Sequence, residues 1–412
     1  MKILYVAGMP LPIENLLSGK SEIEGFPAFY FPMRKLIERG HQLRFILMSN
    51  FEGPFEVKVD WFSSEWIVAN IFMKHSERRG PYRVLRRASR AAQLFAALLK
   101  EARADRYDLI YAHGAECAFV AQIVGELTGT LIGVRWYGDT DVCLRDISNF
   151  GALQAALRNP VHYANFVLRH AFFLATDDGT GVDAINAAWR PKRSRSRFYH
   201  WKTGIEFKEP IPSNSSVQVP LEKYIFHAAR FQHRKRQDRV VSLLHMLHER
   251  GIHLHLYLAG HLEGGPSSQE YIAEVRGVVQ ALGLEDYVHF LGGVSQDTVR
   301  ILARHAVATV LLQDHSNLGN FFYEAMSVGA VLVVSDDGSA SQFVVDGESG
   351  FVVSNISEAA DAVERVYWSP QLAEQIRRQA ISVARQEFMS AQERFDKEVA
   401  LIEGVHGNLP CE

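Results

Sequence analysis

Residues 225–237 read IFHAARFQHRKRQ, and this stretch decides how the C-terminal half of the chain folds. Its apolar beginning is typical of a buried strand, and the strand ends in a basic loop that contains Arg230 and Lys235. Further along, residues 316–326 read SNLGNFFYEAM, which places Glu324 where a glycine-containing loop becomes a helix. Two cations after one strand, with the free N–H groups and positive dipole end of a helix after another, can hold a diphosphate. The acid can bind hydroxyls of the group that the diphosphate carries, so the two stretches predict a sugar-nucleotide site.

Short apolar runs alternate with helical patterns on both sides of this stretch. In the C-terminal half we expect strands at residues 224–227, 253–259, 288–291, 308–312 and 330–335, and helices at residues 238–250, 268–282, 296–305 and 320–328. In the N-terminal half we expect strands at residues 2–7, 43–48, 107–112, 131–136 and 171–176, and helices at residues 28–39 and 116–127. Strands that are apolar along their length and alternate with helices predict an α/β protein with two doubly wound, Rossmann-like parallel sheets.

The segment from Lys208 to Pro220 interrupts this alternation. It reads KEPIPSNSSVQVP, contains three prolines and no helical period, and is typical of an interdomain linker. A chain of 412 residues is also long enough for two domains. We therefore expect one domain over residues 1–207 and a second over residues 208–387. The last helical patterns, at residues 370–387 and 392–403, are expected to pack back across both domains, and residues 388–412 to return to the first.

Composition excludes several classes of protein. A net charge of −3 gives no reason to expect a nucleic-acid partner. Cys117, Cys143 and Cys411 form neither a CxxC motif nor a disulfide framework. Residues 1–8 are too short an apolar run for a signal peptide, and no run approaches the ~20 residues of a membrane helix. We expect a cytoplasmic protein.

These stretches resemble the GT-B glycosyltransferases of family GT4, and the resemblance extends over most of the chain. Arg230 and Lys235 are similar to the spaced Arg and Lys of that family (GR-x4-K), with Ala229 in place of the glycine. Glu324 is similar to the second acid of its E-x7-E element. Further similar stretches are HFLGGV at 289–294, DGESGFVV at 346–353, RGH at 39–41, YAHG at 111–114 and WYGD at 136–139.

The resemblance implies a retaining, metal-independent transferase that uses a nucleoside-diphosphate sugar. It implies that the C-terminal domain binds the donor, that the N-terminal domain binds a hydroxyl-bearing acceptor, and that reaction occurs between them. The acceptor class stays open among a glycan, a lipid-linked acceptor and a small molecule. The implied catalytic residues are Arg230, Lys235 and Glu324; the implied donor contacts are Gly25, Leu291, Gly292, Ser316, Asn317, Leu318, Gly319 and Asn320; and His113, Tyr137 and Asp139 are implied to line the acceptor side. No cofactor and no metal are expected, and a UDP-sugar is the preferred donor because uridine is frequent in the family.

The chain departs from the family pattern at three further points. Ser316 stands where the family has the first acid of E-x7-E, so we expect altered donor selectivity. Tyr137 stands where the family has a histidine near the transferring sugar. The paired glycines of the family's first loop are reduced to Gly25. These departures keep two alternatives open: a non-catalytic GT-B protein that binds a nucleotide or glycan, and a sugar-nucleotide epimerase or hydrolase.

Each feature also has a plainer interpretation. Arg230 and Lys235 could be solvated basic residues, and Ser316, Asn317 and Asn320 could simply cap a helix. Asp139, Thr140 and Asp141 spell the DxD pattern of metal-dependent transferases of another fold, but such short acidic patterns are common by chance. The basic segment Lys74–Lys100 is interpreted as a solvated helix face, and peripheral contact with the inner face of a membrane is the alternative.

Overall fold

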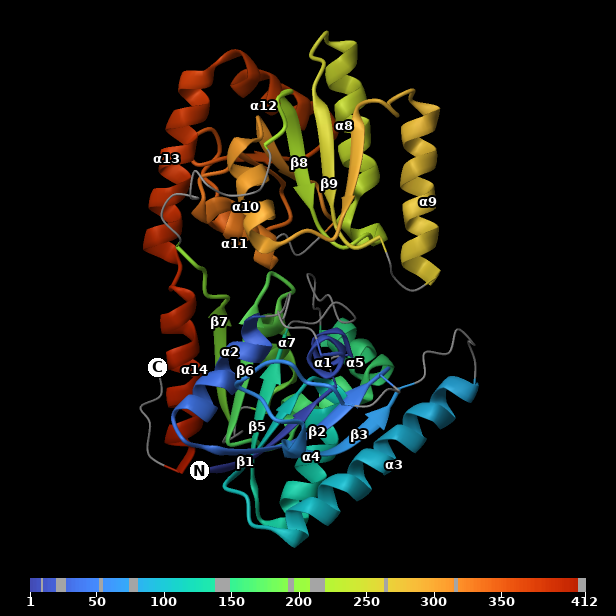
Figure 1. The fold of residues 1–412 in the computed structure, drawn as a ribbon, viewed down its shortest axis with the longest axis vertical. Helices are drawn as coiled ribbons and strands as arrows, with labels where there is room; N and C mark the ends of the chain where they lie inside the picture. Colours follow the sequence, from blue (N-terminus) through green and yellow to red (C-terminus); the bar gives the residue numbers. More distant parts are fainter. Residues whose placement is uncertain are drawn as a thin grey trace. The chain divides into compact units, whose positions relative to one another are not determined.

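The protein folds into two compact units, which a computed structural model describes over residues 1–8, 10–19, 27–51, 55–73, 81–137, 149–191, 196–207, 219–262, 266–314 and 318–406 (Figure 1). Unit 1 comprises Met1–Lys202 and Glu393–Glu412, and unit 2 comprises Thr203–Gln392. Most of the expected linker, residues 208–218, lies outside the described residues. Among the described helices, none has the length and hydropathy to cross a bilayer.

Unit 1 is built on a parallel sheet with the strand order β3-β2-β1-β4-β5-β6-β7. Its strands are β1 Lys2–Ala7, β2 Gln42–Ser49, β3 Ile67–Phe72, β4 Leu109–His113, β5 Leu131–Trp136, β6 Phe172–Asp177 and β7 Arg197–Lys202. Its helices are α1 Pro10–Leu17, α2 Pro27–Glu38, α3 Pro81–Ala104, α4 Ala115–Thr128, α5 Asn149–Arg158, α6 Pro160–Val167, α7 Val182–Trp189 and, after unit 2, α14 Ala391–Glu403. All strands of this sheet run parallel, and the helices of unit 1 carry the chain back between most of them.

The apolar run of β1 explains why both faces of this sheet are covered. Ile3 and Tyr5 point to one face, where they pack with residues of α1, α2 and α14. Leu4 and Val6 point to the other face and pack with residues of α3 and α4. Successive side chains of a strand alternate between faces, so only a strand that is apolar throughout can be buried on both sides.

Unit 2 repeats the plan with the strand order β10-β9-β8-β11-β12-β13. Its strands are β8 Tyr224–Ala228, β9 His255–Ala259, β10 Val288–Gly292, β11 Ala308–Leu311, β12 Leu332–Ser335 and β13 Phe351–Val353. Its helices are α8 Gln237–Glu249, α9 Pro266–Ala281, α10 Gln296–His305, α11 Asn320–Ser327, α12 Ile356–Trp368 and α13 Pro370–Glu387. Ile225 faces α8, α9 and α12, whereas Phe226 faces α10, α11 and α13.

The predicted fold class is confirmed, and the differences concern the edges of the sheets. Strands β3, β7 and β13 were not predicted, because edge strands are short or carry polar side chains. The expected strand at 330–335 begins only at Leu332, and the one at 253–259 begins at His255. Helices α1, α5, α6, α7 and α12 were also missed.

Candidate functional site

The two stretches singled out in the sequence meet where the strand order of unit 2 reverses. Strands β8 and β11 are neighbours, while β9 lies on the far side of β8 and β12 on the far side of β11. The loops that follow β8 and β11 therefore leave toward opposite faces of the sheet. Doubly wound sheets bind ligands at this position, beyond the carboxyl ends of the strands.

The loop after β8 has a backbone that the neighbouring strands hold in place. The N–H of Ala229 donates to the carbonyl of Ala259 at 3.0 Å, and the N–H of Gly260 donates to the carbonyl of Gly292 at 2.8 Å. A Cβ atom on Gly260 would lie 2.1 Å from the Ala229 carbonyl oxygen, so only glycine permits this approach. The turn ends at Arg236, whose φ of 52° is left-handed and whose side chain pairs with Asp238 at 2.7 Å.

Lys235, in the loop after β8, is held by a residue of the loop after β11, where the strand order reverses. Its ammonium group donates a hydrogen bond to the side-chain oxygen of Gln313, which follows β11. The N–H of Asp314 donates to the carbonyl of Arg234 at 3.2 Å, and the Asp314 carboxylate pairs with Arg239 at 2.7 Å. The loops after β8 and β11 are thus joined by main-chain and side-chain contacts, which fix the position of the lysine.

Arg230 differs from Lys235 in having no such restraint. Its side chain is exposed and makes no hydrogen bond or ion pair with any residue that the structure describes. Its carbonyl accepts a hydrogen bond from the Gln237 side chain at 3.1 Å, which fixes its backbone. An exposed guanidinium in the same loop as a positioned ammonium is suited to bind an anionic ligand, because its planar fork matches phosphate oxygens.

Buried His227 lies under this loop, within reach of the charge of Lys235. Its Nδ1–H donates to the carbonyl of Val310 on the adjacent strand at 2.7 Å. Burial, with a smaller contribution from Lys235, lowers the pKa of His227 to about 4. The imidazole is therefore neutral at physiological pH and adds no charge to the two cations above it.

The loop after β11 leads directly into helix α11. Ser316 and Asn317, two of the predicted donor contacts, lie outside the described residues. Leu318 is buried among the side chains between the sheet and α11, and it anchors the end of the loop. Gly319 precedes the helix, a Cβ atom there would meet nothing within 4 Å, and Asn320 is exposed at the first helical position. The start of α11 is thus accessible to an anion.

Glu324 is oriented toward the helix that follows β10. The side-chain N–H of Gln296, the first residue of α10, donates to the Glu324 carboxylate. Burial raises the pKa of Glu324, and the hydrogen bond from Gln296 and the charge of Arg300 oppose this rise. Leu291 and Gly292 end β10 at the same edge of the sheet, and Gly292 has a φ of 72°. The predicted donor residues that the structure describes therefore lie at the carboxyl ends of β8, β10 and β11 or in the segments that directly follow these strands.

In unit 1, the structure brings His113 and Tyr137 together. His113 ends β4, Tyr137 follows β5, and the His113 Nδ1 atom lies 2.7 Å from the Tyr137 hydroxyl. His113 has no exposed surface, and burial lowers its pKa well below the usual value. Buried Arg135 stacks on the Tyr137 ring at 4.4 Å from its centroid. Gly25 and Asp139 lie outside the described residues, as do residues 74–80 of the basic segment Lys74–Lys100.

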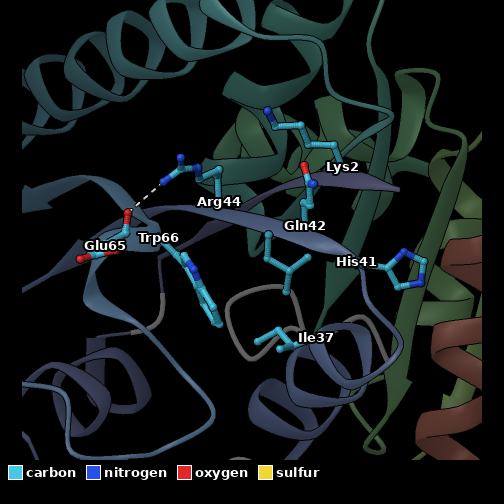
Figure 2. Close-up of a pocket in the computed structure, with 8 residues that line it drawn as sticks. Lys2, Ile37, His41, Gln42, Arg44, Glu65 and Trp66 are labelled. Atoms are coloured by element: carbon cyan, nitrogen blue, oxygen red, sulfur yellow. Dashed lines mark hydrogen bonds between the residues drawn. The ribbon is translucent and has the colours of Figure 1, made fainter.

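A separate cavity of unit 1 plays no part in this arrangement. It has a volume of about 470 Å³ and lies at the amino ends of β1 and β2, where Lys2 and Gln42 begin these strands (Figure 2). Its two basic strand residues already have partners: Lys2 pairs with Asp105, and Arg44 donates to the Glu65 main-chain carbonyl at 2.9 Å. The predicted acceptor residues His113 and Tyr137 lie at the opposite, carboxyl ends of the strands.

Sequence reasoning missed Gln313, Asp314 and Gln296, which position the predicted residues. Gln313 and Asp314 directly follow the apolar run of β11, and this position at the point of reversal is the signal that could have identified them. Gln296 has no comparable signal, because its partner Glu324 comes from a different helix.

Comparison with known proteins matches part of the chain to one family. Residues 213–383 match the family model "Glycosyl transferases group 1". The GDP-mannose-dependent alpha-(1-6)-phosphatidylinositol monomannoside mannosyltransferase of Mycobacterium tuberculosis is 30% identical over 174 residues, which are 40% of this chain and 42% of that protein. The alpha-D-kanosaminyltransferase of Streptomyces kanamyceticus is 31% identical over 101 residues, 24% of this chain and 26% of that protein. The matches thus span less than half the length of these relatives.

Solved structures match the whole chain in fold. Sucrose-phosphate synthase from Thermosynechococcus elongatus superposes with a TM-score of 0.71 at 15% identity, covering 99% of this chain and 100% of that one. Anabaena HepE in complex with UDP-glucose superposes with a TM-score of 0.65 at 18% identity, covering 98% and 99%. Residues 213–383 therefore match the glycosyl transferases group 1 model, and the chain has the two-domain GT-B fold of these structures.

Proposed function

We propose that this protein is a retaining, metal-independent glycosyltransferase that takes its sugar from a nucleoside diphosphate. The observation that carries the proposal is the joined pair of loops after β8 and β11, which fixes Lys235 in the same loop as Arg230, whose side chain pairs with no described residue. The site lies within residues 213–383, the part of the chain that matches glycosyl transferases group 1. The positive end of α11 adds main-chain donors at the same edge of the sheet.

In this proposal the two cations stabilise the leaving diphosphate. As the bond between the anomeric carbon and the phosphate oxygen breaks, negative charge develops on that oxygen. Arg230 and Lys235 lower the barrier because they are oriented before the charge develops. The backbone from Leu318 to Asn320 holds the phosphates, Leu291 and Gly292 flank the base, and Glu324 orients hydroxyls of the ribose or the sugar. The charge that a metal supplies in other transferases comes here from these side chains.

We assign acceptor binding to unit 1, near the carboxyl ends of β4 and β5. His113 is too deeply buried to contact an acceptor, so its role is to position Tyr137 through their hydrogen bond. The acceptor hydroxyl attacks the face from which the diphosphate leaves, its proton passes to the departing phosphate oxygen, and the anomeric configuration is retained. Comparison of the anomeric proton coupling in donor and product by NMR tests retention, and an inverted product would contradict it.

For the donor nucleoside, the leading candidates are uridine and guanosine. Uridine is the family-based expectation and the ligand in the complex of HepE with UDP-glucose, whereas the mycobacterial relative is named for GDP-mannose. Thermal unfolding with UDP, GDP, ADP and TDP, each with and without EDTA, decides between them. A ligand at about 100 times its Kd adds about 2.7 kcal/mol of stability. We expect one nucleotide to raise Tm equally with and without the chelator.

Product analysis distinguishes transfer from the other activities open to this fold. Incubation of the donor with acceptor candidates should give a product that carries the sugar. Free sugar without an acceptor product would indicate a hydrolase, an isomerised donor would indicate an epimerase, and nucleotide binding without turnover would indicate a binding protein. If no nucleotide changes Tm, the assignment of the donor site is wrong.

A further inference from the structure

A second cluster of chemically reactive side chains lies at the amino ends of the unit 2 strands, whereas the donor site lies at their carboxyl ends. His255 begins β9, His289 is the second residue of β10, and Glu222 lies two residues before β8. These are the amino ends of three adjacent strands, whereas the donor site follows the carboxyl ends of β8, β10 and β11. The full length of these strands therefore lies between this cluster and the proposed donor site.

The register of the sheet places the two imidazoles on one face. Tyr257 pairs with His289 across β9 and β10, and His255 lies two positions before Tyr257 on the same strand. Side chains at i and i+2, and side chains directly opposite on a neighbouring strand, share a face of the sheet. The intervening Leu256 points to the other face, where it packs with residues of α8 and α9.

The geometry of the cluster is close to that of a metal-ligand set. Nδ1 of His255 lies 2.9 Å from Nε2 of His289, and one ligand atom from each of His255, His289 and Glu222 lies within 4.8 Å of the others. Two imidazole nitrogens bound to one tetrahedral zinc lie about 3.3 Å apart, given Zn–N bonds of about 2.0–2.1 Å. Coordination of a shared ion requires loss of the proton between the rings, a widening of their N···N distance by a few tenths of an ångström, and rotation of the side chains so that both nitrogens and a Glu222 oxygen point to one centre.

The carboxylate of this cluster is also oriented. The Tyr257 hydroxyl donates a hydrogen bond to Oε1 of Glu222, and the Tyr257 ring stacks on His289 with centroids 4.5 Å apart. A hydrogen bond from a neighbouring group to a ligating carboxylate is typical of metal sites, where it fixes the orientation of the ligand. Tyr257 contacts two members of the cluster and so holds them in one arrangement.

We propose that Glu222, His255 and His289 bind one divalent transition-metal ion, of which zinc is the best match, with water as the fourth ligand. Two imidazoles and one carboxylate suit zinc, cobalt and nickel, whereas magnesium and calcium prefer oxygen ligands alone. The ion links the start of β9 and β10 to the segment that enters β8, and it thereby stabilises this edge of unit 2. The site is independent of the proposed transfer reaction, in which no metal takes part.

The test is calorimetric titration of zinc into the full chain, freed of any affinity tag and treated first with a chelator that is then removed. The wild-type protein should bind one zinc ion, and cobalt should give the visible absorption bands of a tetrahedral site. His255→Ala and His289→Ala should each abolish the one-site binding. Tyr257→Phe should weaken it about 10- to 100-fold, because it removes the group that orients Glu222.

The matched control is His253→Ala, since His253 is an exposed histidine two residues from His255 and outside the cluster. This variant should bind zinc like the wild type. Circular dichroism and the unchanged Tm increase with nucleotide show that each variant is folded. The proposal is overturned if all variants show the same weak, multi-site zinc binding, if His253→Ala loses as much affinity as His289→Ala, or if the wild-type chain binds magnesium as tightly as zinc.

Discussion

The ammonium group of Lys235 donates a hydrogen bond to the side-chain oxygen of Gln313, and this contact joins the loops that follow β8 and β11. The two residues are distant in sequence and meet only because their strands are neighbours at the point where the strand order reverses. Lys235 is thereby held in place before any ligand arrives. A preoriented charge is more effective toward a developing phosphate charge than one that must first be ordered.

The Lys235–Gln313 contact predicts a defined effect of Gln313→Met, which keeps the length of the side chain but removes the acceptor. Loss of one hydrogen bond costs about 1 kcal/mol. If the orientation of Lys235 matters for donor binding, the dissociation constant of the nucleotide should rise about fivefold. Calorimetric titration of the nucleotide measures this. An unchanged dissociation constant would show that the contact does not contribute to binding.

The double substitution Arg230→Ala, Lys235→Ala should reduce kcat/KM by at least about a thousandfold, because it removes both side-chain charges proposed to stabilise the leaving group. Steady-state kinetics with the identified donor measure the change, and circular dichroism should show an unchanged fold. The control is Arg378→Ala, which removes an exposed arginine of α13 in the same unit. Near-normal rates in the double variant would show that the phosphate site lies elsewhere.

The buried ion pair between Arg135 and Glu398 predicts a large loss of stability for Glu398→Gln. The Arg135 Nε atom lies 3.4 Å from Glu398, Arg394 lies 3.0 Å from the same oxygen, and the Tyr111 hydroxyl donates to the other oxygen at 2.7 Å. Glu398 on α14 has no exposed surface. Its neutralisation removes the negative charge that faces two buried guanidinium groups, so urea denaturation should show unit 1 destabilised by about 3–5 kcal/mol.

Glu403→Gln on the same helix is the control for this prediction. Glu403 pairs with Arg39 at 2.9 Å at the surface, where such pairs contribute about 0–1 kcal/mol. Equal loss of stability in the two variants would contradict the explanation by burial.

The low pKa of His227 predicts a pH dependence of the stability of unit 2. In the unfolded chain this histidine takes up a proton near pH 6.5, whereas in the folded protein it does so only near pH 4. Below pH 6.5 the unfolded state therefore binds more protons, and acid favours unfolding. The contribution of His227 should be fully present above pH 6.5 and should fall by about 3 kcal/mol as the pH decreases to 4.

His227→Asn tests this prediction, because its amide can still donate to the Val310 carbonyl but does not titrate. Free energies of unfolding from urea denaturation at pH 7.0, 6.0, 5.0 and 4.5 should decrease less steeply in the variant than in the wild type. Parallel curves would show that other groups cause the acid sensitivity.

Much of the architecture was predictable because it rests on local patterns. Continuous apolar runs such as Ile3–Ala7 identify strands buried on both faces, and residues 296–305 and 370–387 were predicted with the bounds that α10 and α13 have. The edge strand β7, RFYHWK, was missed because a strand with half-exposed polar side chains lacks that pattern. Arg230 and Lys235 could be selected because a basic loop directly follows a buried strand.

The sequence by itself thus determined the two α/β halves and the chemical character of the donor loop, because both depend on residues close together in the chain. Tertiary structure alone decided which distant residues meet. It paired Lys235 with Gln313, Glu324 with Gln296 and Arg135 with Glu398, and it brought His255 to His289. No local pattern encodes these contacts, since each requires a particular strand order, register or helix position that arises only when the sheets assemble.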